Sequence, residues 1–382
     1  MTRPIRILHV ISGDLWAGAE AQAYTLIGWL RRHPDAVVGA VVLNAGTLTD
    51  KLRALGIPVK VYDETQLNAV RILRRLTDRI QEWRPDLIHT HREKENILAA
   101  IANRLARRVP LVRTVHGGEE PRRRQRWLAV RRRLVTGVDR LVRRFSAETL
   151  IAVSAELAAN LPERARGRVA VIENGVDCEE VRARILGTDA SPRTSGAVHI
   201  GIVGRLVPVK RVDLFLETAA RLIATEPAWP WRFEVFGDGP ERARLEALRN
   251  RLGLIGYATF HGHRADIARG IGGLDVLVMC SDHEGMPMAA LEAAALGVPT
   301  VGHAVGGLVD LLPTEFQVER HDPVGYGDAI LRALRDDVRE AAAARLGVTL
   351  ERFSAARNGE RTLALYRRLI DASGGSTEHR LE

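Results

Sequence analysis

The chain has 382 residues, of which 46% are hydrophobic and 27% are charged, a composition typical of a globular protein. This length exceeds what one hydrophobic core usually fills, so we expect two domains. No apolar run reaches membrane-spanning length, and the apolar stretch near the N-terminus is too short for a signal-peptide core, so we expect a cytoplasmic protein.

The cysteines and the charged residues narrow the class of protein further. Cys178 and Cys280 lie far apart and outside any CxxC or Cys/His spacing, which argues against a disulfide framework and a structural zinc. We expect both to be small buried hydrophobic residues. The whole net charge of +9 belongs to the N-terminal half.

Strand-like and helical runs alternate along the N-terminal half. The predicted strands are 5–11, 37–43, 59–63, 86–91, 110–116, 149–154 and 168–176, and the predicted helices are 19–32, 48–55, 67–83, 95–107 and 122–144. Repeated strand and helix units of this size predict a doubly wound parallel sheet.

One of these helices, between Arg122 and Arg144, is strongly basic. Arginines such as Arg131, Arg132 and Arg133 interleave there with apolar residues, the pattern of a basic amphipathic helix. It is either a solvated cationic face or a surface for anionic lipid headgroups. Nucleic acid is not expected as a partner, because no aromatic stacking platform or recognition-helix motif accompanies the charge.

The same alternation restarts after a stretch rich in Ser, Thr, Gly and Pro. It predicts strands at 198–204, 231–237, 257–262, 274–280 and 299–305, with helices between them. We therefore expect an α/β protein of two Rossmann-like, doubly wound domains facing a central cleft. The predicted parts are an N-terminal domain (1–185), a linker (186–197), a C-terminal domain (198–360), a helix that could pack back on the N-terminal domain (361–372) and a disordered tail (373–382).

The segment from Ser281 to Pro299 is the most informative motif. A buried strand runs into a polar loop with Glu284, and Pro287 then opens an apolar helix that contains Glu292. The unpaired amides at such a helix start suit an anion such as pyrophosphate. Because like charges repel, the two carboxylates are expected to bind hydroxyls of a ribose or a hexose instead.

Other polar residues follow predicted strands, where parallel sheets bind ligands. Arg205 and Lys210 could neutralise a pyrophosphate without a metal, and His116 lies at a strand end beside two glycines. Asp14 and Glu20 flank the first glycine loop and are candidates for acid–base function.

Two further patterns are weaker. His89 and His91 share a strand face, but no third ligand stands at a recognisable spacing, so metal binding there is a minority interpretation. Neither a GxGxxG fingerprint nor a GxxxxGK[ST] loop is present, which argues against a nucleotide-dependent dehydrogenase.

Together these motifs resemble a retaining glycosyltransferase of family 4, with the GT-B fold, over nearly the whole chain. The matching segments are AGAE at 17–20, TVHG with His116, IENGVD at 172–177, VGRLVPVKR at 203–211, FGDGPE, FHGH at 260–263 and EGMPMAALE. The family often has two adjacent glycines at the first of these, and this chain has Ala17 in place of one.

The resemblance implies a role for each matching residue. Arg205 and Lys210 would hold the donor pyrophosphate, Glu292 the ribose, and Glu284 would lie by the donor sugar. His116 would contact the sugar from the other domain, Gly18 would approach the phosphates, and Asp177 would be structural. The candidate catalytic residues are His116, Glu284, Arg205 and Lys210, and the candidate donor-binding residues are Gly18, Gly204, Arg205, Lys210, Gly237, His263, Glu284, Gly285, Met286, Pro287, Met288 and Glu292.

We therefore predict a metal-independent transferase that moves a sugar from a UDP- or GDP-sugar with retention, by front-face attack. The donor is a co-substrate, and no cofactor is expected. The acceptor would be a lipid-linked or saccharide molecule of cell-envelope polysaccharide or glycolipid synthesis, met at the inner membrane face. A catalytically silent sugar-nucleotide binding protein remains the alternative.

Overall fold

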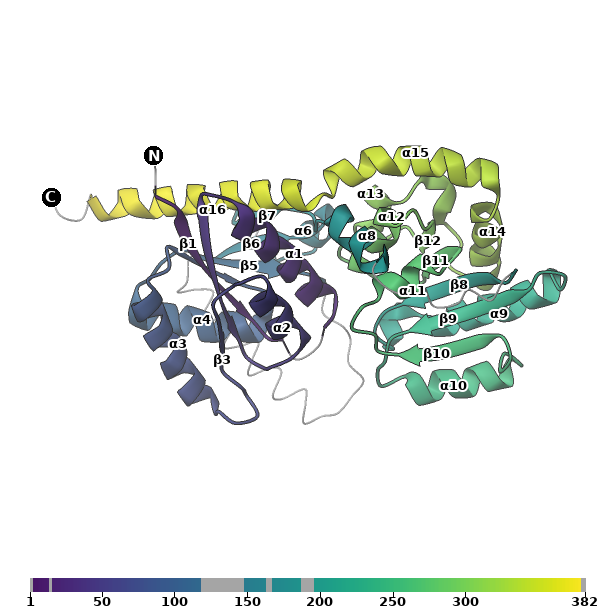
Figure 1. Cartoon of the computed structure of the whole chain (residues 1–382), viewed down its shortest axis with the longest axis horizontal. Coiled ribbons are helices and arrows are strands. Elements are labelled where there is room, and N and C mark those ends of the chain that lie inside the picture. The colour runs from purple at the N-terminus through teal and green to yellow at the C-terminus, as the bar shows by residue number, and fades with distance from the viewer. Residues whose placement is uncertain (1–2, 14–15, 118–147, 163–166, 187–195, 379–382) are drawn as a thin grey trace. The chain divides into compact units, whose positions relative to one another are not determined.

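The computed structural model describes residues 3–13, 16–117, 148–162, 167–186 and 196–378. The chain forms two compact units, unit 1 made of Met1–Asn174 with Ala355–Glu382, and unit 2 made of Gly175–Ser354. Each unit holds a parallel β-sheet with helices packed on it (Figure 1). The predicted α/β class with two Rossmann-like domains is therefore confirmed.

Unit 1 is built on a sheet whose strand order, within the described residues, is β3-β2-β1-β4-β5-β6-β7. Strand β1 is central and pairs in register with two neighbours, so that His9 lies opposite Ala40 on one side and His89 on the other. Most strand residues are buried, as in other parallel sheets covered on both faces. The strands are β1 (Ile5–Ile11), β2 (Ala36–Val42), β3 (Val59–Val61), β4 (Leu87–Thr90), β5 (Leu111–Val115), β6 (Glu148–Ala152) and β7 (Val169–Val171).

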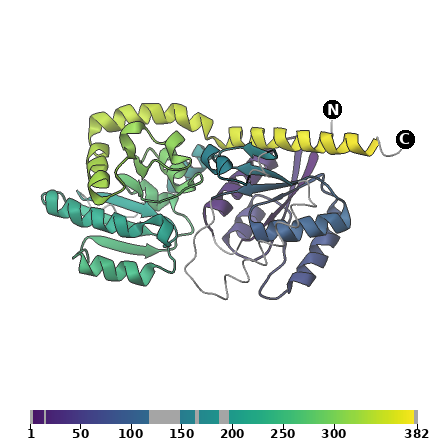
Figure 2. The same cartoon turned by 180° about the vertical axis from the view of Figure 1, so that it is seen from behind.

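Helices cover both faces of this sheet because side chains alternate along each strand. On β1, Leu8 and Val10 pack with α3 and α4, whereas Ile7 and Ile11 pack with α1, α2 and α16. Helix α16 packs against α1, and it lies along one side of unit 1 in both views (Figures 1 and 2). The helices are α1 (Gly18–Arg32), α2 (Thr47–Ala54), α3 (Ala69–Trp83), α4 (Glu93–Ala106), α6 (Ala155–Ala159) and α16 (Ala355–Glu378).

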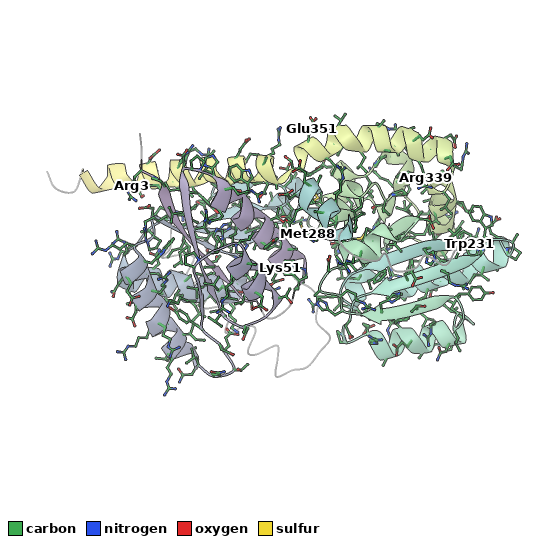
Figure 3. All side chains as sticks on the ribbon, in the orientation of Figure 1. Arg3, Lys51, Trp231, Met288, Arg339 and Glu351 are labelled. Atoms are coloured by element: carbon green, nitrogen blue, oxygen red, sulfur yellow. The ribbon has the colours of Figure 1, made fainter. Side chains whose placement is uncertain are left out.

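Unit 2 repeats the plan with the strand order β10-β9-β8-β11-β12-β13. Trp231, labelled in Figure 3, opens β9 and is buried in one core with Phe215 and Phe233. The strands are β8 (Val198–Val203), β9 (Trp231–Phe236), β10 (Ala258–Gly262), β11 (Val276–Met279), β12 (Thr300–His303) and β13 (Gln317–Val318). The helices are α8 (Cys178–Leu186), α9 (Val212–Thr225), α10 (Arg242–Arg251), α11 (Ala268–Gly272), α12 (Met288–Ala295), α13 (Leu308–Leu311), α14 (Pro323–Ala333) and α15 (Asp336–Arg352), with 3-10 turns η1 (Pro208–Lys210) and η2 (Thr314–Phe316).

The unit boundaries differ from those predicted, 1–185 and 198–360. Helix α8 belongs to unit 2, where Arg182 Nε donates a hydrogen bond to the carbonyl of Ala295 over 2.8 Å. The chain returns to unit 1 at Ala355, and Asn358 binds the carbonyl of Glu173 there. Contacts distant in sequence therefore set both boundaries, and no local composition signal marks them.

Helix α16 also extends further than predicted, from Ala355 to Glu378, so the expected disordered tail at 373–382 is largely helical where it is described. Gly359 lets α16 approach α1 closely, since a Cβ at this position would lie 2.2 Å from the ring of Trp29. Most of the predicted linker and the basic segment between Arg122 and Arg144 lie outside the described residues.

Two expectations about the whole chain can be compared with the structure. Both cysteines are free thiols; Cys280 is buried as expected, whereas Cys178 is only partly so. Within the described residues, no helix is sufficiently long and apolar to cross a bilayer.

Candidate functional site

Unit 2 places Glu284 in a loop between the end of β11 and the start of α12. A second glycine turn supports this loop: Gly306 has φ +56°, and a Cβ there would lie 2.0 Å from the carbonyl oxygen of Glu284. The amide of Gly307 donates a hydrogen bond to the carbonyl of Gly285 over 2.6 Å. Only glycines allow this backbone contact, which fixes the position of the Glu284 loop.

Lys210 and Glu284, which are 74 residues apart, form an ion pair in this loop. Lys210 Nζ donates to Glu284 Oε1 over 2.6 Å, and Ser281 Oγ donates to the same oxygen over 2.6 Å. Lys210 comes from η1, which follows β8, and Ser281 follows the adjacent strand β11. A small pocket lined by Gly204, Lys210 and Ser281 lies beside the pair. The structure thus brings together a cation and a carboxylate that sequence reasoning selected separately.

The loops that follow two neighbouring strands pack against each other at Gly204 and Gly237. Gly237 has φ +136°, and a Cβ there would lie 1.8 Å from the carbonyl oxygen of Gly204. Its amide also donates to the carbonyl of Gly262 over 2.9 Å. The requirement for glycine at 237 therefore comes from this packing. Arg205 and His263 are both exposed at this edge of the sheet.

The start of α12 is more buried than an open anion site would be. Pro287 is its N-cap residue in extended conformation, and Met286 and Met288 are 3% and 6% exposed. Met288 is labelled at this position in Figure 3. Because Met286 packs against Gly307, the turn from Gly285 to Met288 is part of the core beneath the Glu284 loop.

Glu292 lies one turn into α12 and is 5% exposed. Burial raises its carboxyl pKa from 4.5 to about 7, although nearby Arg184 counteracts part of this shift. Arg184 Nη1 is 3.5 Å from Glu292 Oε1 and also binds Glu180. Arg184 belongs to α8, which sequence reasoning assigned to the other domain and therefore missed as a partner.

In unit 1, the first glycine loop leads directly into α1. Gly18 opens the helix, and Ala17 is its N-cap with φ −138° and ψ −176°, a conformation that alanine adopts without strain. Glu20 is buried and paired with Arg92, the N-cap of α4. The candidate acid–base residue Glu20 is thus held in an ion pair, and Asp14 lies outside the described residues.

Four histidines of unit 1 gather at the carboxyl ends of β1, β4 and β5. Register and alternation place His9, His89, His91 and His116 on one face of the sheet. His9 Nδ1 lies 3.2 Å from His91 Nε2, and His91 Nδ1 lies 3.4 Å from His116 Nε2. Sequence reasoning missed His9, although it alternates with Ile7 and Ile11 on β1.

Burial makes these imidazoles neutral. It lowers the pKa of His9 and of His116 to about 3, and it lowers the pKa of His89 and His91 well below the usual value. Arg92 adds to the effect on His116, because a nearby cation disfavours a second positive charge.

His9 supplies the third ligand that a metal interpretation of His89 and His91 lacked. The three residues offer ring nitrogens within 4.8 Å of one another. However, His9 and His91 meet edge to edge, with His9 Nδ1 3.2 Å from His91 Nε2, and His91 stacks on His89 at an interplanar angle of 25°. The facing nitrogens of His9 and His91 are thus directed at each other, whereas metal ligands direct their lone pairs at one point. Both nitrogens of His89 also have partners, the hydroxyls of Tyr366 and Thr114.

Comparison with known families and proteins agrees with this arrangement. The profile of Glycosyltransferase Family 4 matches residues 16–180, and that of Glycosyl transferases group 1 matches residues 197–336. The chain is also 34% identical over 322 residues to the 2-deoxystreptamine N-acetyl-D-glucosaminyltransferase of Streptomyces fradiae, covering 77% of this chain and 73% of that protein. The chain belongs to glycosyltransferase family 4.

Other relatives of this family 4 chain extend the comparison. It is 28% identical to the UDP-Gal:alpha-D-GlcNAc-diphosphoundecaprenol alpha-1,3-galactosyltransferase of Escherichia coli, over 87% of this chain and 89% of that protein. Anabaena HepE in complex with UDP has a similar structure, with a TM-score of 0.74 at 21% identity, covering 95% of this chain and 100% of that one. WaaG, a glycosyltransferase involved in lipopolysaccharide biosynthesis, gives 0.67 at 14% identity over 95% and 99%. The two units therefore have the GT-B fold.

Replacing Lys210 or Arg205 by alanine is expected to weaken binding of a free nucleoside diphosphate. Each change removes a charged hydrogen bond to pyrophosphate, worth roughly 1.5 to 3 kcal/mol. Glu284→Gln should not weaken binding, because it removes the carboxylate that occupies Lys210. Calorimetry with UDP measures this, with Arg251→Ala, an exposed arginine of α10, as the matched control. If Lys210→Ala and Arg205→Ala both bound UDP with unchanged affinity, these two residues would not bind the pyrophosphate.

Glu292→Gln is expected to stabilise the fold at alkaline pH. Between pH 4.5 and about 7 the folded carboxyl keeps a proton that the unfolded one has released, so stability falls as pH rises through this window. The neutral amide avoids that loss and should gain on the order of 2 to 3 kcal/mol at pH 8, but much less at pH 4. Urea unfolding of both proteins at the two pH values checks the prediction, and a difference independent of pH would contradict it.

Proposed function

We propose that this family 4 glycosyltransferase moves a sugar from a UDP-sugar to an acceptor hydroxyl with retention of configuration and without a metal ion. The observation that carries the proposal is the Lys210–Glu284 pair at the carboxyl end of the unit 2 sheet. Similar folds support the choice of donor, since structures of HepE are described in complex with UDP and with UDP-glucose. GDP-sugars are the second candidate class of donor.

Lys210 would exchange one anion for another during donor binding. Its side chain is 23% exposed and that of Glu284 is 8% exposed, so the pair is partly shielded from water. A pyrophosphate carries more negative charge than one carboxylate, so it would attract the Lys210 ammonium away from Glu284. The Glu284 carboxylate would then accept a hydrogen bond from a hydroxyl of the transferred sugar. Arg205, exposed at the same edge, would add a second cation. Fixed positive charge of this kind stabilises the leaving group without a Lewis acid.

The chemical step would follow the front-face route. The acceptor hydroxyl attacks the anomeric carbon from the side that the phosphate leaves, and its proton passes to the departing phosphate oxygen. The bond from the anomeric carbon to the phosphate oxygen breaks as the new glycosidic bond forms, so UDP is released. Glu292 would hold the ribose, and its raised pKa means that it can act as a hydrogen-bond donor as well as an acceptor.

For the acceptor, we propose a molecule of cell-envelope polysaccharide or glycolipid synthesis. The name of the Escherichia coli relative, whose acceptor is linked to diphosphoundecaprenol, supports a lipid-linked acceptor. A cyclitol is the second candidate, because other relatives are named for 2-deoxystreptamine and for D-inositol 3-phosphate.

The decisive experiment is a thermal-shift screen of UDP-, GDP- and ADP-sugars, followed by donor hydrolysis and transfer assays with and without EDTA. We expect stabilisation by UDP-sugars, turnover that EDTA does not reduce, and an α-linked product from an α-linked donor by NMR. Binding without turnover across acceptors and water would favour a silent binding protein. Loss of activity in EDTA that manganese restores would contradict metal independence, and a β-linked product would contradict retention.

Binding to anionic membranes is expected from the segment between Arg122 and Arg144. Each basic residue that reaches an anionic surface contributes about 1 kcal/mol, and the interleaved apolar residues can insert between headgroups. Vesicles with and without phosphatidylglycerol should pellet the protein differently at low salt. Arg131, Arg132 and Arg133 changed together to Glu should abolish pelleting, whereas no pelleting of the unaltered protein would contradict the prediction.

A further inference from the structure

Arg211 directly follows Lys210 and has an unusual backbone conformation. Its φ is +47° and its ψ is 44°, in the left-handed region that glycine occupies without cost. Among the described residues, Arg84 and Arg108 also have positive φ, but they lie where the long helices α3 and α4 end, and such a conformation is common there. Arg211 instead joins the single 3-10 turn η1 directly to α9, and the N-cap of a helix is usually extended.

The Arg211 guanidinium binds two carboxylates. Nη1 lies 3.3 Å from Asp282 Oδ1, and Nε lies 3.3 Å from Asp213 Oδ1. Asp213 is in the first turn of α9, whereas Asp282 belongs to the Glu284 loop. Arg211 therefore connects the turn that carries Lys210 to the loop that carries Glu284, and glycine could not form this bond.

Three segments of unit 2 meet at Asp282. Its amide donates a hydrogen bond to the carbonyl of Val209 over 2.9 Å, and its Oδ1 lies 3.1 Å from Nε2 of His321, which follows β13. Ser281 and Glu284, which bond each other beside Lys210, lie on either side of Asp282 in the chain. A shift of Asp282 relative to Arg211 would therefore change the distance between Lys210 and Glu284.

The Arg211–Asp282 pair contributes geometry rather than stability. The two side chains are 32% and 40% exposed, and ion pairs this exposed add little to the stability of a fold. A positive φ in an arginine also costs free energy, and such conformations occur where surrounding contacts impose them, often at functional sites. Both observations favour a local role beside Lys210 over a role in folding.

We propose that Arg211 is a positioning residue that keeps Lys210 at the edge of the sheet when Lys210 releases Glu284. In the ligand-free protein the Lys210–Glu284 pair itself joins the two segments. A bound pyrophosphate would attract Lys210 and break this link, whereas the bonds from Asp282 to Arg211 and Val209 would remain. That the incoming anion is a pyrophosphate rests on the proposed function.

Amide hydrogen exchange of the ligand-free protein tests the connection directly. Arg211→Gly permits the same backbone conformation and removes the guanidinium. We expect the Asp282 amide to exchange about three- to fivefold faster, the factor that the coupling of an exposed ion pair predicts, and the amides of β9 to be unchanged. Arg84→Gly is the matched control, because Arg84 has φ +50° and an exposed side chain. An Asp282 amide that exchanges no faster in Arg211→Gly would overturn the proposal, whether or not the protein binds UDP.

The second measurement is the affinity for UDP by calorimetry. Arg211→Gly should weaken binding about threefold, again the factor expected for one exposed ion pair. Asp282→Ala breaks the same bond from the other side, and it replaces Arg211→Gly in both measurements if that variant does not fold. The double variant should bind no more weakly than the weaker single variant, because both changes remove one interaction.

Two results of the calorimetry would contradict a positioning role: unchanged affinity in both single variants, or losses that add in the double variant. If the unaltered protein did not bind UDP, the proposed function would fail, and the exchange of the Asp282 amide would decide the role of Arg211 alone.

Discussion

The carboxyl ends of parallel strands lie at one edge of a sheet, and both candidate sites of this protein depend on that constraint. The strands themselves are buried on both faces and have little room for polar side chains. Polar groups therefore concentrate where strands end. In unit 2 this edge brings Lys210 to Glu284, and in unit 1 it brings His9 to His91 and His116, although each set is spread over more than seventy residues of chain.

The two edges differ in their electrostatics. In unit 2 the charges are paired: Lys210 with Glu284, and Arg184 with Glu180 and Glu292. Pairing is needed there because an isolated buried charge costs several kcal/mol, on the order of what a whole domain has in net stability. Glu292 shows the limit of such compensation, since its pKa still rises to about 7 despite Arg184. The buried carboxyl of Glu292 therefore lowers the stability of the folded protein at pH values above this pKa.

Much of this organisation could be predicted from sequence. Local patterns suffice for the alternation of strands and helices, and for the strand-to-helix loop of Glu284 in unit 2. The Lys210 and Glu292 positions follow from the family motifs. The features that could not be predicted depend on contacts distant in sequence. They are the packing of α8 in unit 2, the packing of α16 on unit 1 from Ala355 onward, and the contact between Arg184 and Glu292. His9 was missed for the same reason, because one histidine in an apolar strand gains a meaning only when its register with β4 is known.

Unit 1 accommodates its buried polar groups in a different way. Glu20 forms an ion pair with Arg92, whereas the neighbouring histidines lose their charge, since burial lowers the pKa of His9 and of His116 to about 3 and the pKa of His89 and of His91 well below the usual value. A neutral imidazole needs no counter-ion, and it can donate one hydrogen bond and accept another. His9, His91 and His116 can therefore satisfy one another at this edge, and they avoid the desolvation cost that the ionised carboxyl of Glu292 carries in unit 2.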